Sequence, residues 1–238
     1  MILLFTDFGY EGPYVGLLHT MLTARAPGVP VIDLMHDAPT FRPREAGVLL
    51  EALVSWMPPR SIVVGVVDPG VGSERAALLA RAGDRWFIGP DNGLFAPLLE
   101  SEEVRVWQLP IAESAAPSFH GRDVFAPAAA VLSCGVMPRG IRRARTWVGR
   151  GERCRRSRVV YVDGFGNVML GVRADALAEG EGPRFDGSPL PRARTFADRP
   201  SGDAFWYENS LGLVEVAVNR GSAARRFGLE VGKTVPLG

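Results

Sequence analysis

Three polar side chains in the first half of the sequence form a set that can activate water. Asp68 directly follows the apolar run 61–67, Arg75 lies in the same glycine-containing loop, and His120 lies in a loop ahead of an alanine-rich segment. A carboxylate at the end of a buried strand is partly desolvated, which raises its basicity. Arginine keeps its charge, and imidazole can exchange protons near neutral pH. Taken singly, Asp68 could equally form a turn, and His120 could be a structural loop residue.

Other polar residues extend this candidate site. Asp7 follows the first apolar run and could bind a pair of ribose hydroxyls, although an aspartate there also suits a turn. His36 could line the same cleft, whereas His19 lies in a helical pattern and is expected at the surface. The sequence has no HxxxH, HxH or CxxC spacing, so we expect no metal site. It also lacks the Gly-x-Ser-x-Gly elbow of esterases, and the glycines at 70–72 lack the ending of a phosphate loop.

Apolar runs and amphipathic segments alternate through the first half of the chain. Such alternation predicts an α/β fold with a mostly parallel sheet and flanking helices, which binds ligands where its strands end. The candidate residues all lie at such ends or in the loops beyond them. The predicted strands are 2–5, 31–34, 61–67, 76–80, 86–88 and 104–108, with 76–80 and 86–88 forming a hairpin, and the predicted helices are 13–25, 44–56 and 124–133.

The second half has a different texture. Short strands at 159–162, 168–172, 204–207 and 213–218 are separated by glycine, proline and aspartate, and the only clear helix signal is at 223–228. This pattern predicts a smaller C-terminal β-barrel or sandwich domain. We therefore divide the chain into an α/β domain, 1–150, and a β-barrel domain, 156–238, with the boundary between residues 145 and 158.

The composition is that of a globular protein without a strong overall field. The 238 residues are 47% hydrophobic and carry a net charge of +1, which favours no nucleic-acid partner. We interpret the arginine-rich stretch from Arg139 to Arg158 as a solvated linker or a subunit interface rather than an RNA-binding strip. No apolar run approaches the roughly 20 residues of a membrane helix, and no leader pattern precedes the first strand, so we expect a cytoplasmic location. Cys134 and Cys154 form no disulfide framework.

The polar clusters, taken in order, resemble the S-adenosylmethionine hydrolase family, also called the S-adenosylmethionine hydroxide adenosyltransferases. The resemblance runs from TDFG at 6–9 through VDPGVGSER and FHGRD to VAVN at 216–219. The family's Asp-Arg-His triad falls on Asp68, Arg75 and His120. Related halogenating enzymes differ at the positions of Asp68 and His120. The resemblance therefore implies that water attacks S-adenosyl-L-methionine at C5′ and releases adenosine and L-methionine.

The resemblance also implies how the substrate is held. It implies a homotrimer with active sites between neighbouring subunits. Displacement by water requires no metal and no cofactor, so we expect neither. Relatives often carry aspartate at the position of Gly12, near the methionine amine in the halogenating enzymes, so this chain departs from the pattern at the methionine end. By resemblance, Asp7 binds the ribose hydroxyls, the neighbouring chain's Asn167, Ser210, Glu215 and Val218 hold adenine and the rest of the ligand, and Asp163 and Tyr207 lie near the methionine portion.

We hypothesise a mechanism in which the barrier lies with the nucleophile. The sulfonium leaves as a neutral thioether, whereas water is a weak nucleophile at neutral pH. Asp68 and His120 are predicted to form a hydrogen-bonded pair that accepts or relays the water proton, with Arg75 positioning the water. Three other functions stay open: a protein that binds S-adenosylmethionine or a nucleoside without turnover, a halide-dependent adenosyl transferase, and a metal-dependent phosphohydrolase.

Overall fold

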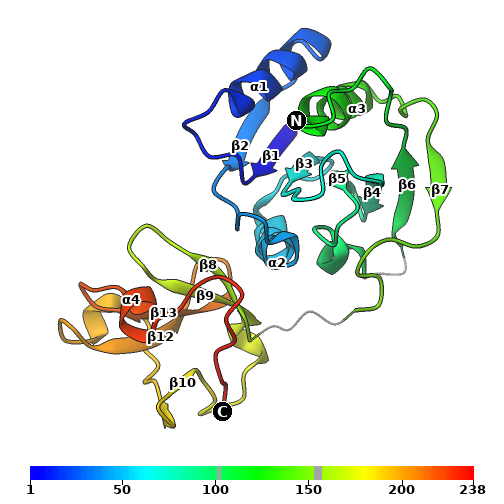
Figure 1. Cartoon of the computed structure of the whole chain (residues 1–238). Coiled ribbons are helices and arrows are strands. Elements are labelled where there is room, and N and C mark those ends of the chain that lie inside the picture. The colour runs from blue at the N-terminus through cyan, green and yellow to red at the C-terminus, as the bar shows by residue number, and fades with distance from the viewer. Residues whose placement is uncertain (101–102, 153–156) are drawn as a thin grey trace. The chain divides into compact units, whose positions relative to one another are not determined.

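The computed structural model describes residues 1–100, 103–152 and 157–238 and divides into two compact units (Figure 1). The N-terminal unit comprises Met1–Gly47 and Trp56–Glu152, and the C-terminal unit comprises Val48–Ser55 and Arg153–Gly238. The boundary region expected at 145–158 includes 153–156, which lie outside the described residues, and so does Cys154. Within the described part of the chain, no helix has the length and apolarity needed to cross a membrane.

One seven-stranded sheet organises the N-terminal unit. Its strands are β1 (Ile2–Thr6), β2 (Val31–Met35), β3 (Ile62–Val66), β4 (Ala77–Ala82), β5 (Arg85–Pro90), β6 (Arg105–Leu109) and β7 (Arg142–Ala144), in the order β2-β1-β3-β5-β4-β6-β7. The pairs β2–β1, β1–β3 and β3–β5 are parallel. The pairs β5–β4, β4–β6 and β6–β7 are antiparallel, and the first of them is the predicted hairpin. β1 and β3 are buried along their whole length, as expected for parallel strands covered on both faces.

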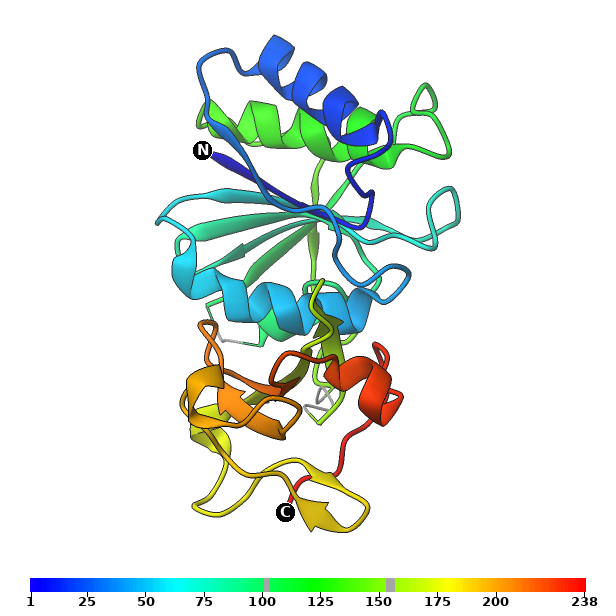
Figure 2. The same cartoon turned by 90° about the vertical axis from the view of Figure 1, so that its left-hand side faces the viewer.

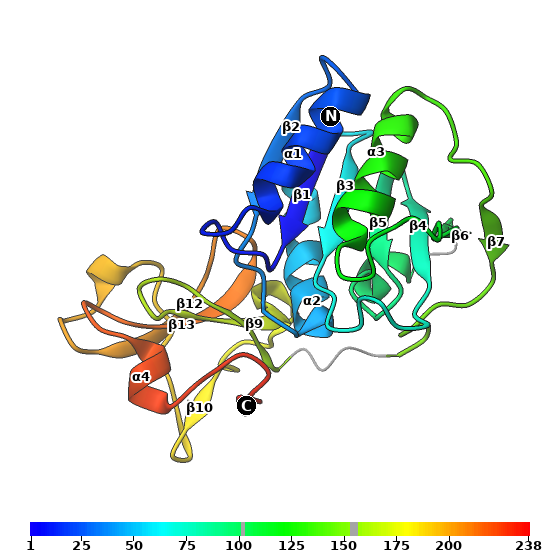
Figure 3. The ribbon, with the colours of Figure 1, turned by 45° about the horizontal axis from the view of Figure 1, so that its top comes forward.

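The N-terminal unit holds the helices α1 (Tyr14–Arg25) and α3 (Ala126–Ser133) and the first turn of α2 (Pro43–Leu53), which continues into the C-terminal unit from Val48 on. Figures 2 and 3 show α1 and α3 side by side on one face of the sheet, and Figure 2 shows the start of α2 on the other. Leu18 and Leu22 of α1 are fully buried in one core cluster with the alanines of α3 and inward-facing strand residues. Of the helix predicted at 124–133, the first two residues belong to a π-helical turn, Gly121–Phe125, and the α-helix begins at Ala126. The helix predicted at 44–56 ends in a 3-10 turn, Val54–Trp56.

The structure corrects the interpretation of the arginine-rich stretch as a linker. Arg142–Ala144 form β7, which pairs antiparallel with β6 and is the last strand of the sheet. The Arg143 guanidinium lies over the Trp107 ring, 4.9 Å from its centroid. Two arginines and an alanine carry no apolar alternation, so the pairing with β6, and not local pattern, makes this strand.

A four-stranded antiparallel sheet organises the C-terminal unit. Its strands are β8 (Val159–Val162), β9 (Val168–Arg173), β12 (Ala204–Glu208) and β13 (Leu213–Val218), in the order β12-β13-β9-β8, and a small hairpin joins β10 (Arg184–Phe185) to β11 (Ser188–Pro189). The smaller β domain is as predicted, but these strands form an open sheet and not a closed barrel. Single bridges, Arg192 to Trp206 and Arg158 to Thr234, extend it where glycine- and proline-rich segments interrupt regular pairing.

The core of the C-terminal unit is built from the inward side chains of β8, β9 and β13. Val159, Leu170, Val214 and Val216 are fully buried. The short helix α4 (Ala223–Phe227) packs against this core through Ala223 and has a clear signal at each end. The Ser222 hydroxyl accepts a hydrogen bond from the Arg225 backbone, and Gly228 ends the helix in the left-handed conformation.

Candidate active site

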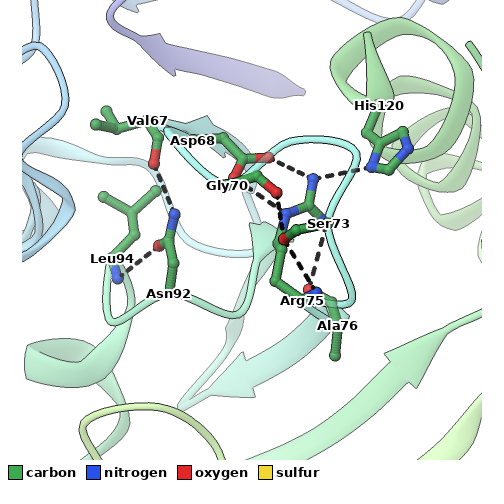
Figure 4. A network of polar contacts seen from close by, with 9 residues as sticks. All are labelled: Val67, Asp68, Gly70, Ser73, Arg75, Ala76, Asn92, Leu94 and His120. Carbon is green, nitrogen blue, oxygen red and sulfur yellow. Dashed lines mark hydrogen bonds and ion pairs between the residues drawn. The ribbon is translucent and has the colours of Figure 1, made fainter. Parts of the chain in front are cut away.

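The side chains of Asp68, Arg75 and His120 meet in the N-terminal unit (Figure 4). Asp68 follows β3, Arg75 precedes β4, and His120 precedes the π turn that leads into α3. Arg75 Nε donates to Asp68 Oδ1 at 3.0 Å, and Arg75 Nη2 donates to Asp68 Oδ2. The same Nη2 lies 2.9 Å from His120 Nδ1. The side chains of Arg75 and Asp68 are only 8% and 4% exposed, and His120 is 4% exposed, so the group is held away from bulk water.

The contact between Arg75 and His120 fixes the tautomer of the histidine. A guanidinium has donors and no acceptor, so His120 Nδ1 must accept and the ring proton is on Nε2. Burial, and next the positive charge of Arg75, lower the pKa of His120 below its usual value. His120 is therefore a neutral imidazole whose free ring position is a donor.

This geometry corrects one sequence-based expectation. Asp68 and His120 were expected to bond to each other, whereas Arg75 lies between them and bonds to both. The two side chains come from different loops, and the long arginine side chain fills the space between those loops. The arrangement is Asp68–Arg75–His120, with the arginine in the centre.

Gly72 brings the two loops together. Its φ is +80°, and a Cβ at this position would lie 2.8 Å from the carbonyl oxygen of Pro117. Gly72 lies between Asp68 and Arg75 in the chain, and Pro117 precedes His120, so this close approach sets the distance between the triad members. Ser73 closes the same loop, because its Oγ donates to the Gly70 carbonyl at 2.6 Å.

The turn at 89–93 braces the end of β3. Asn92 Nδ2 donates to the Val67 carbonyl at 2.8 Å, and its Oδ1 accepts from the Leu94 backbone at 3.2 Å (Figure 4). Asp91 Oδ1 accepts from the Val148 backbone at 2.8 Å, and burial raises the pKa of Asp91. Asparagine in a turn usually bonds locally, so its long-range bond to the residue before Asp68 left no signal in the sequence.

Asp7 lies with two of the triad members at one cavity. The cavity has a volume of about 100 Å³ and is lined by Asp7, Asp68 and His120 together with Phe8, Phe41 and Phe119. Asp7 Oδ2 accepts from the Phe41 backbone at 3.3 Å. Burial raises the pKa of Asp7, and the nearby Asp68 charge adds to this effect. The cavity thus combines carboxylates, a neutral imidazole and aromatic rings.

Gly12 lies in the loop between β1 and α1 and is exposed. A Cβ there would lie 3.2 Å from Cδ2 of the Tyr14 ring. Tyr14, Phe8 and Phe119 form an aromatic group, with ring centroids 5.3–5.9 Å apart. The position at which relatives often carry an acid is therefore next to an aromatic group that reaches the cavity.

The two other histidines both contact Asp33 on β2. His19 on α1 has a partly exposed side chain, with Nε2 2.7 Å from Asp33 Oδ1. His36 is fully buried, with Nε2 3.0 Å from the same oxygen and Nδ1 2.7 Å from Thr6 Oγ1. His36 is absent from the residues that line the cavity, so it supports the site from behind and does not line it as expected. Among the residues that the structure describes, no group of three or more His, Cys, Asp or Glu could hold a metal ion.

The C-terminal residues implied by the resemblance gather at a second, open cavity of about 670 Å³. Asp163, Asn167, Tyr207 and Val218 line it, with Phe165 and Asn219. Asp163 organises this wall, because its Oδ1 accepts from the Asn167 backbone at 2.8 Å and its Oδ2 from Asn167 Nδ2 at 2.9 Å. Ser210 is exposed in the β12–β13 turn and is not among the lining residues.

Glu215 lies beneath this wall rather than in it. It is 3% exposed, accepts from the Tyr207 hydroxyl at 2.5 Å, and accepts from Asn209 Nδ2 at 2.8 Å. Asn209 Oδ1 in turn accepts from the Leu211 and Leu213 backbones, which shapes the turn that carries Ser210. Burial raises the pKa of both Glu215 and Tyr207. The polar cluster 207–210 stands out in the sequence, but no role was predicted for Asn209, because an asparagine in a turn needs no partner outside it.

Comparison with known families covers both units. Residues 2–142 match the SAM hydroxide adenosyltransferase N-terminal domain, and residues 157–236 match the C-terminal domain of the same name. The chain belongs to the SAM hydroxide adenosyltransferase family. Asp7 and the triad lie in the N-terminal match, and Asp163, Tyr207 and Glu215 lie in the C-terminal match.

Curated relatives align along almost the whole chain. The (R)-S-adenosyl-L-methionine hydrolase of Thermus thermophilus is 39% identical and covers 98% of this chain and 97% of its own. The protein of the same name from Salinispora arenicola is 37% identical, with 92% and 90% coverage.

Solved structures share the fold. An uncharacterized conserved protein from Thermotoga maritima has a TM-score of 0.88 at 27% identity, covering 100% of this chain and 99% of its own. A conserved hypothetical protein from Thermus thermophilus has a TM-score of 0.79 at 34% identity, with 99% and 97% coverage.

Proposed function

We propose that this protein hydrolyses S-adenosyl-L-methionine to adenosine and L-methionine, with the R configuration at sulfur that the names of its relatives specify. The observation that carries the proposal is the buried Asp68–Arg75–His120 group at the cavity that also holds Asp7. A sulfonium with three different substituents is a stereocentre. Substrate recognition must therefore distinguish the two epimers, and the assay must present both.

The reaction is a displacement at C5′. A water oxygen forms a bond to C5′, the C5′–S bond breaks, and its electron pair remains on sulfur, which leaves as the neutral thioether of methionine. The water loses one proton and becomes the 5′-hydroxyl of adenosine. No acid is needed for the leaving group, so the protein's task is to take that proton and hold the oxygen in line.

Asp68 is the proposed proton acceptor. Each of its carboxylate oxygens accepts one hydrogen bond from Arg75 and keeps further acceptor capacity. His120 Nδ1 has its single lone pair engaged by Arg75, so His120 acts as a donor through Nε2 and holds the attacking oxygen. Arg75 stabilises negative charge that develops on both neighbours, since its guanidinium stays charged.

Substrate contacts follow the two cavities. Asp7 is proposed to bind the ribose hydroxyls beside the triad. From the neighbouring chain of the trimer, Asn167, Val218 and Ser210 are proposed to bind adenine and the rest of the ligand. Asp163 and Tyr207 are proposed to lie near the methionine portion, with Glu215 acting through its bond to Tyr207.

We propose that the reaction needs neither a metal nor a cofactor, and that the chain works as a cytoplasmic homotrimer. The chemistry above supports the first point, because each step uses side chains of the chain itself. Full activity in excess chelator is the expected result, and sedimentation equilibrium measures the mass of the assembly. Metal-stimulated release of phosphate from phosphate esters would instead support a phosphohydrolase.

The test uses the chelator-treated protein with each sulfur epimer in water labelled with heavy oxygen, with and without chloride. We expect adenosine and methionine from the R epimer, with the label in adenosine and no effect of chloride. Asp68→Asn should lower kcat by about 10²–10⁴-fold with a smaller change in KM. Asp84→Asn is the matched control, because Asp84 lies in the exposed β4–β5 turn of the same unit.

Other outcomes would refute either the hydrolase proposal or the catalytic role of Asp68 within it. Retention of adenosine or S-adenosylmethionine without product would favour a binding protein. A 5′-chloro nucleoside formed with chloride would favour a halide-dependent transferase. Equal turnover by Asp68→Asn and Asp84→Asn would leave the hydrolysis but remove the triad from it.

A further inference from the structure

Two fully buried polar residues behind the cavity have no part in the proposed chemistry. Thr6, the last residue of β1, and His36, which follows β2, are both 0% exposed. Thr6 Oγ1 lies 2.7 Å from His36 Nδ1 and accepts from the Phe8 backbone at 3.2 Å. Asp7 lies between Thr6 and Phe8 in the chain, so the bond from Phe8 N–H to the Thr6 hydroxyl closes the turn that carries Asp7.

The contact at Nε2 of His36 determines which atom donates and which accepts in the Thr6–His36 hydrogen bond. His36 Nε2 is 3.0 Å from Asp33 Oδ1, close enough for an ion pair but not aligned for a hydrogen bond, and an unprotonated Nε2 would turn its lone pair toward this carboxylate. The ring proton is therefore on Nε2, and Nδ1 accepts from the Thr6 hydroxyl. The order of hydrogen bonds is Phe8 N–H to Thr6 Oγ1–H to His36 Nδ1, and the Nε2–H on the far side of the ring faces the Asp33 carboxylate.

The backbone around His36 holds the same turn. Gly9 N donates to the His36 carbonyl at 2.7 Å, and Ala38 N donates to the Thr6 carbonyl at 3.1 Å. The segment that starts at His36 also reaches the functional group itself, because Phe41 N donates to Asp7 Oδ2 at 3.3 Å. The turn with Asp7 and the segment 36–41 thus form one unit, and the Thr6–His36 bond is its buried side-chain link.

We propose that His36 is a positioning residue for Asp7: acting through the Thr6 hydroxyl, it fixes the turn that places the Asp7 carboxylate at the cavity. The inference rests on the proposed function, in which Asp7 binds the ribose hydroxyls. Without the link, Phe8 N–H and His36 Nδ1 lose a partner in a dry interior, and the turn adopts other positions. Asp7 then meets the ribose less often, while the triad on other loops keeps its own contacts.

The test compares Thr6→Val with Thr6→Ser. Valine keeps the shape of threonine and removes the hydroxyl, whereas serine keeps the hydroxyl, so serine is the conservative rescue. A net hydrogen bond corresponds to about 2- to 10-fold in an equilibrium constant. We expect Thr6→Val to raise KM, and the dissociation constant of adenosine, by about 3- to 10-fold, with kcat changed less than 2-fold. Thr6→Ser should stay within 2-fold of the parent in all three.

His19→Ala is the matched control. His19 contacts the same Asp33 oxygen at 2.7 Å but lies on α1, partly exposed, and does not touch Thr6. His19→Ala should leave KM and adenosine affinity unchanged. A second comparison uses His36 itself. The amide oxygen of His36→Asn can replace Nδ1 as the acceptor for Thr6, so this variant should retain more adenosine affinity than His36→Ala. Circular dichroism and thermal melting check that each variant is folded.

The outcomes separate the inference from the proposed function. If the parent protein produces no adenosine and binds none, the proposed function fails before any variant is made. If the parent is active and Thr6→Val equals Thr6→Ser in KM and adenosine affinity, the positioning role is refuted while the hydrolase stands. If Thr6→Val lowers kcat and leaves adenosine affinity unchanged, the link supports the triad and not Asp7, which also overturns the inference.

Discussion

Replacing Gly72 with alanine perturbs the site without touching a polar group. The residue adopts φ +80°, and an added Cβ would lie 2.8 Å from the backbone oxygen of Pro117. The contacted atom belongs to the backbone of the segment that leads to His120, so it cannot rotate away as a side chain could. Either the 68–75 loop or the 117–120 segment must move.

The size of the effect follows from two sources. A non-glycine residue in the left-handed region costs about 1–2 kcal/mol, and forcing an extra methyl into a packed contact costs about 1–3 kcal/mol. The sum is about 2–5 kcal/mol, which for a protein of this size lowers Tm by about 4–20 °C. Because the movement separates Arg75 from His120, now 2.9 Å apart, we also expect kcat to fall by about 10²-fold, as a displacement near 1 Å can produce.

Gly70→Ala provides the control from the same loop. Gly70 does not have a positive φ, and its added Cβ would meet only ordinary contacts, the nearest being Ser73 Oγ at 3.5 Å. Thermal melting and steady-state hydrolysis of S-adenosylmethionine should therefore separate the two variants. If Gly72→Ala melts and turns over like Gly70→Ala, the close approach to Pro117 does not set the triad.

Two further predictions concern titratable groups. Burial raises the pKa of Asp7, so the ionised carboxylate destabilises the folded state above that pKa. Asp7→Asn should therefore raise Tm at neutral pH, show no such gain at acid pH, and weaken adenosine binding. An unchanged Tm at neutral pH would contradict this prediction. Burial and Arg75 lower the pKa of His120, so the unfolded chain takes up this proton first and stability falls as the pH drops through the ordinary value of about 6.5. An NMR titration should give His120 a midpoint below that value, and a midpoint at or above it would exclude the Arg75 contact.

Elements built on long apolar runs could be predicted from the sequence. The run 61–67 gave β3, and the leucines of 13–25 gave α1, because burial on a sheet imposes a period that the sequence displays. β7 escaped prediction because two arginines and an alanine show no such period and depend on pairing with β6. The closed barrel was wrong for a related reason: short strands indicate a β domain, but closure depends on which edges pair.

The candidate site divides in the same way. Residue types and order brought Asp68, Arg75 and His120 together, and the structure places them in contact. Their connection was wrong, because the central place of Arg75 is decided by how Gly72 meets Pro117, a contact between distant segments. His36 was expected in the cleft, yet its partner Thr6 is buried in β1, and only the fold brings that hydroxyl and imidazole together.

The last strand of the N-terminal sheet has a consequence for the behaviour of the protein at high concentration. β7 ends the sheet, and both Arg142 and Arg143 on it are exposed. A terminal strand offers unpaired backbone groups that another chain's strand can join, which is a route to aggregation. Two adjacent guanidinium groups on so short a strand oppose that growth, because a second copy would bring like charges side by side. Part of the arginine-rich stretch thus keeps neighbouring molecules apart.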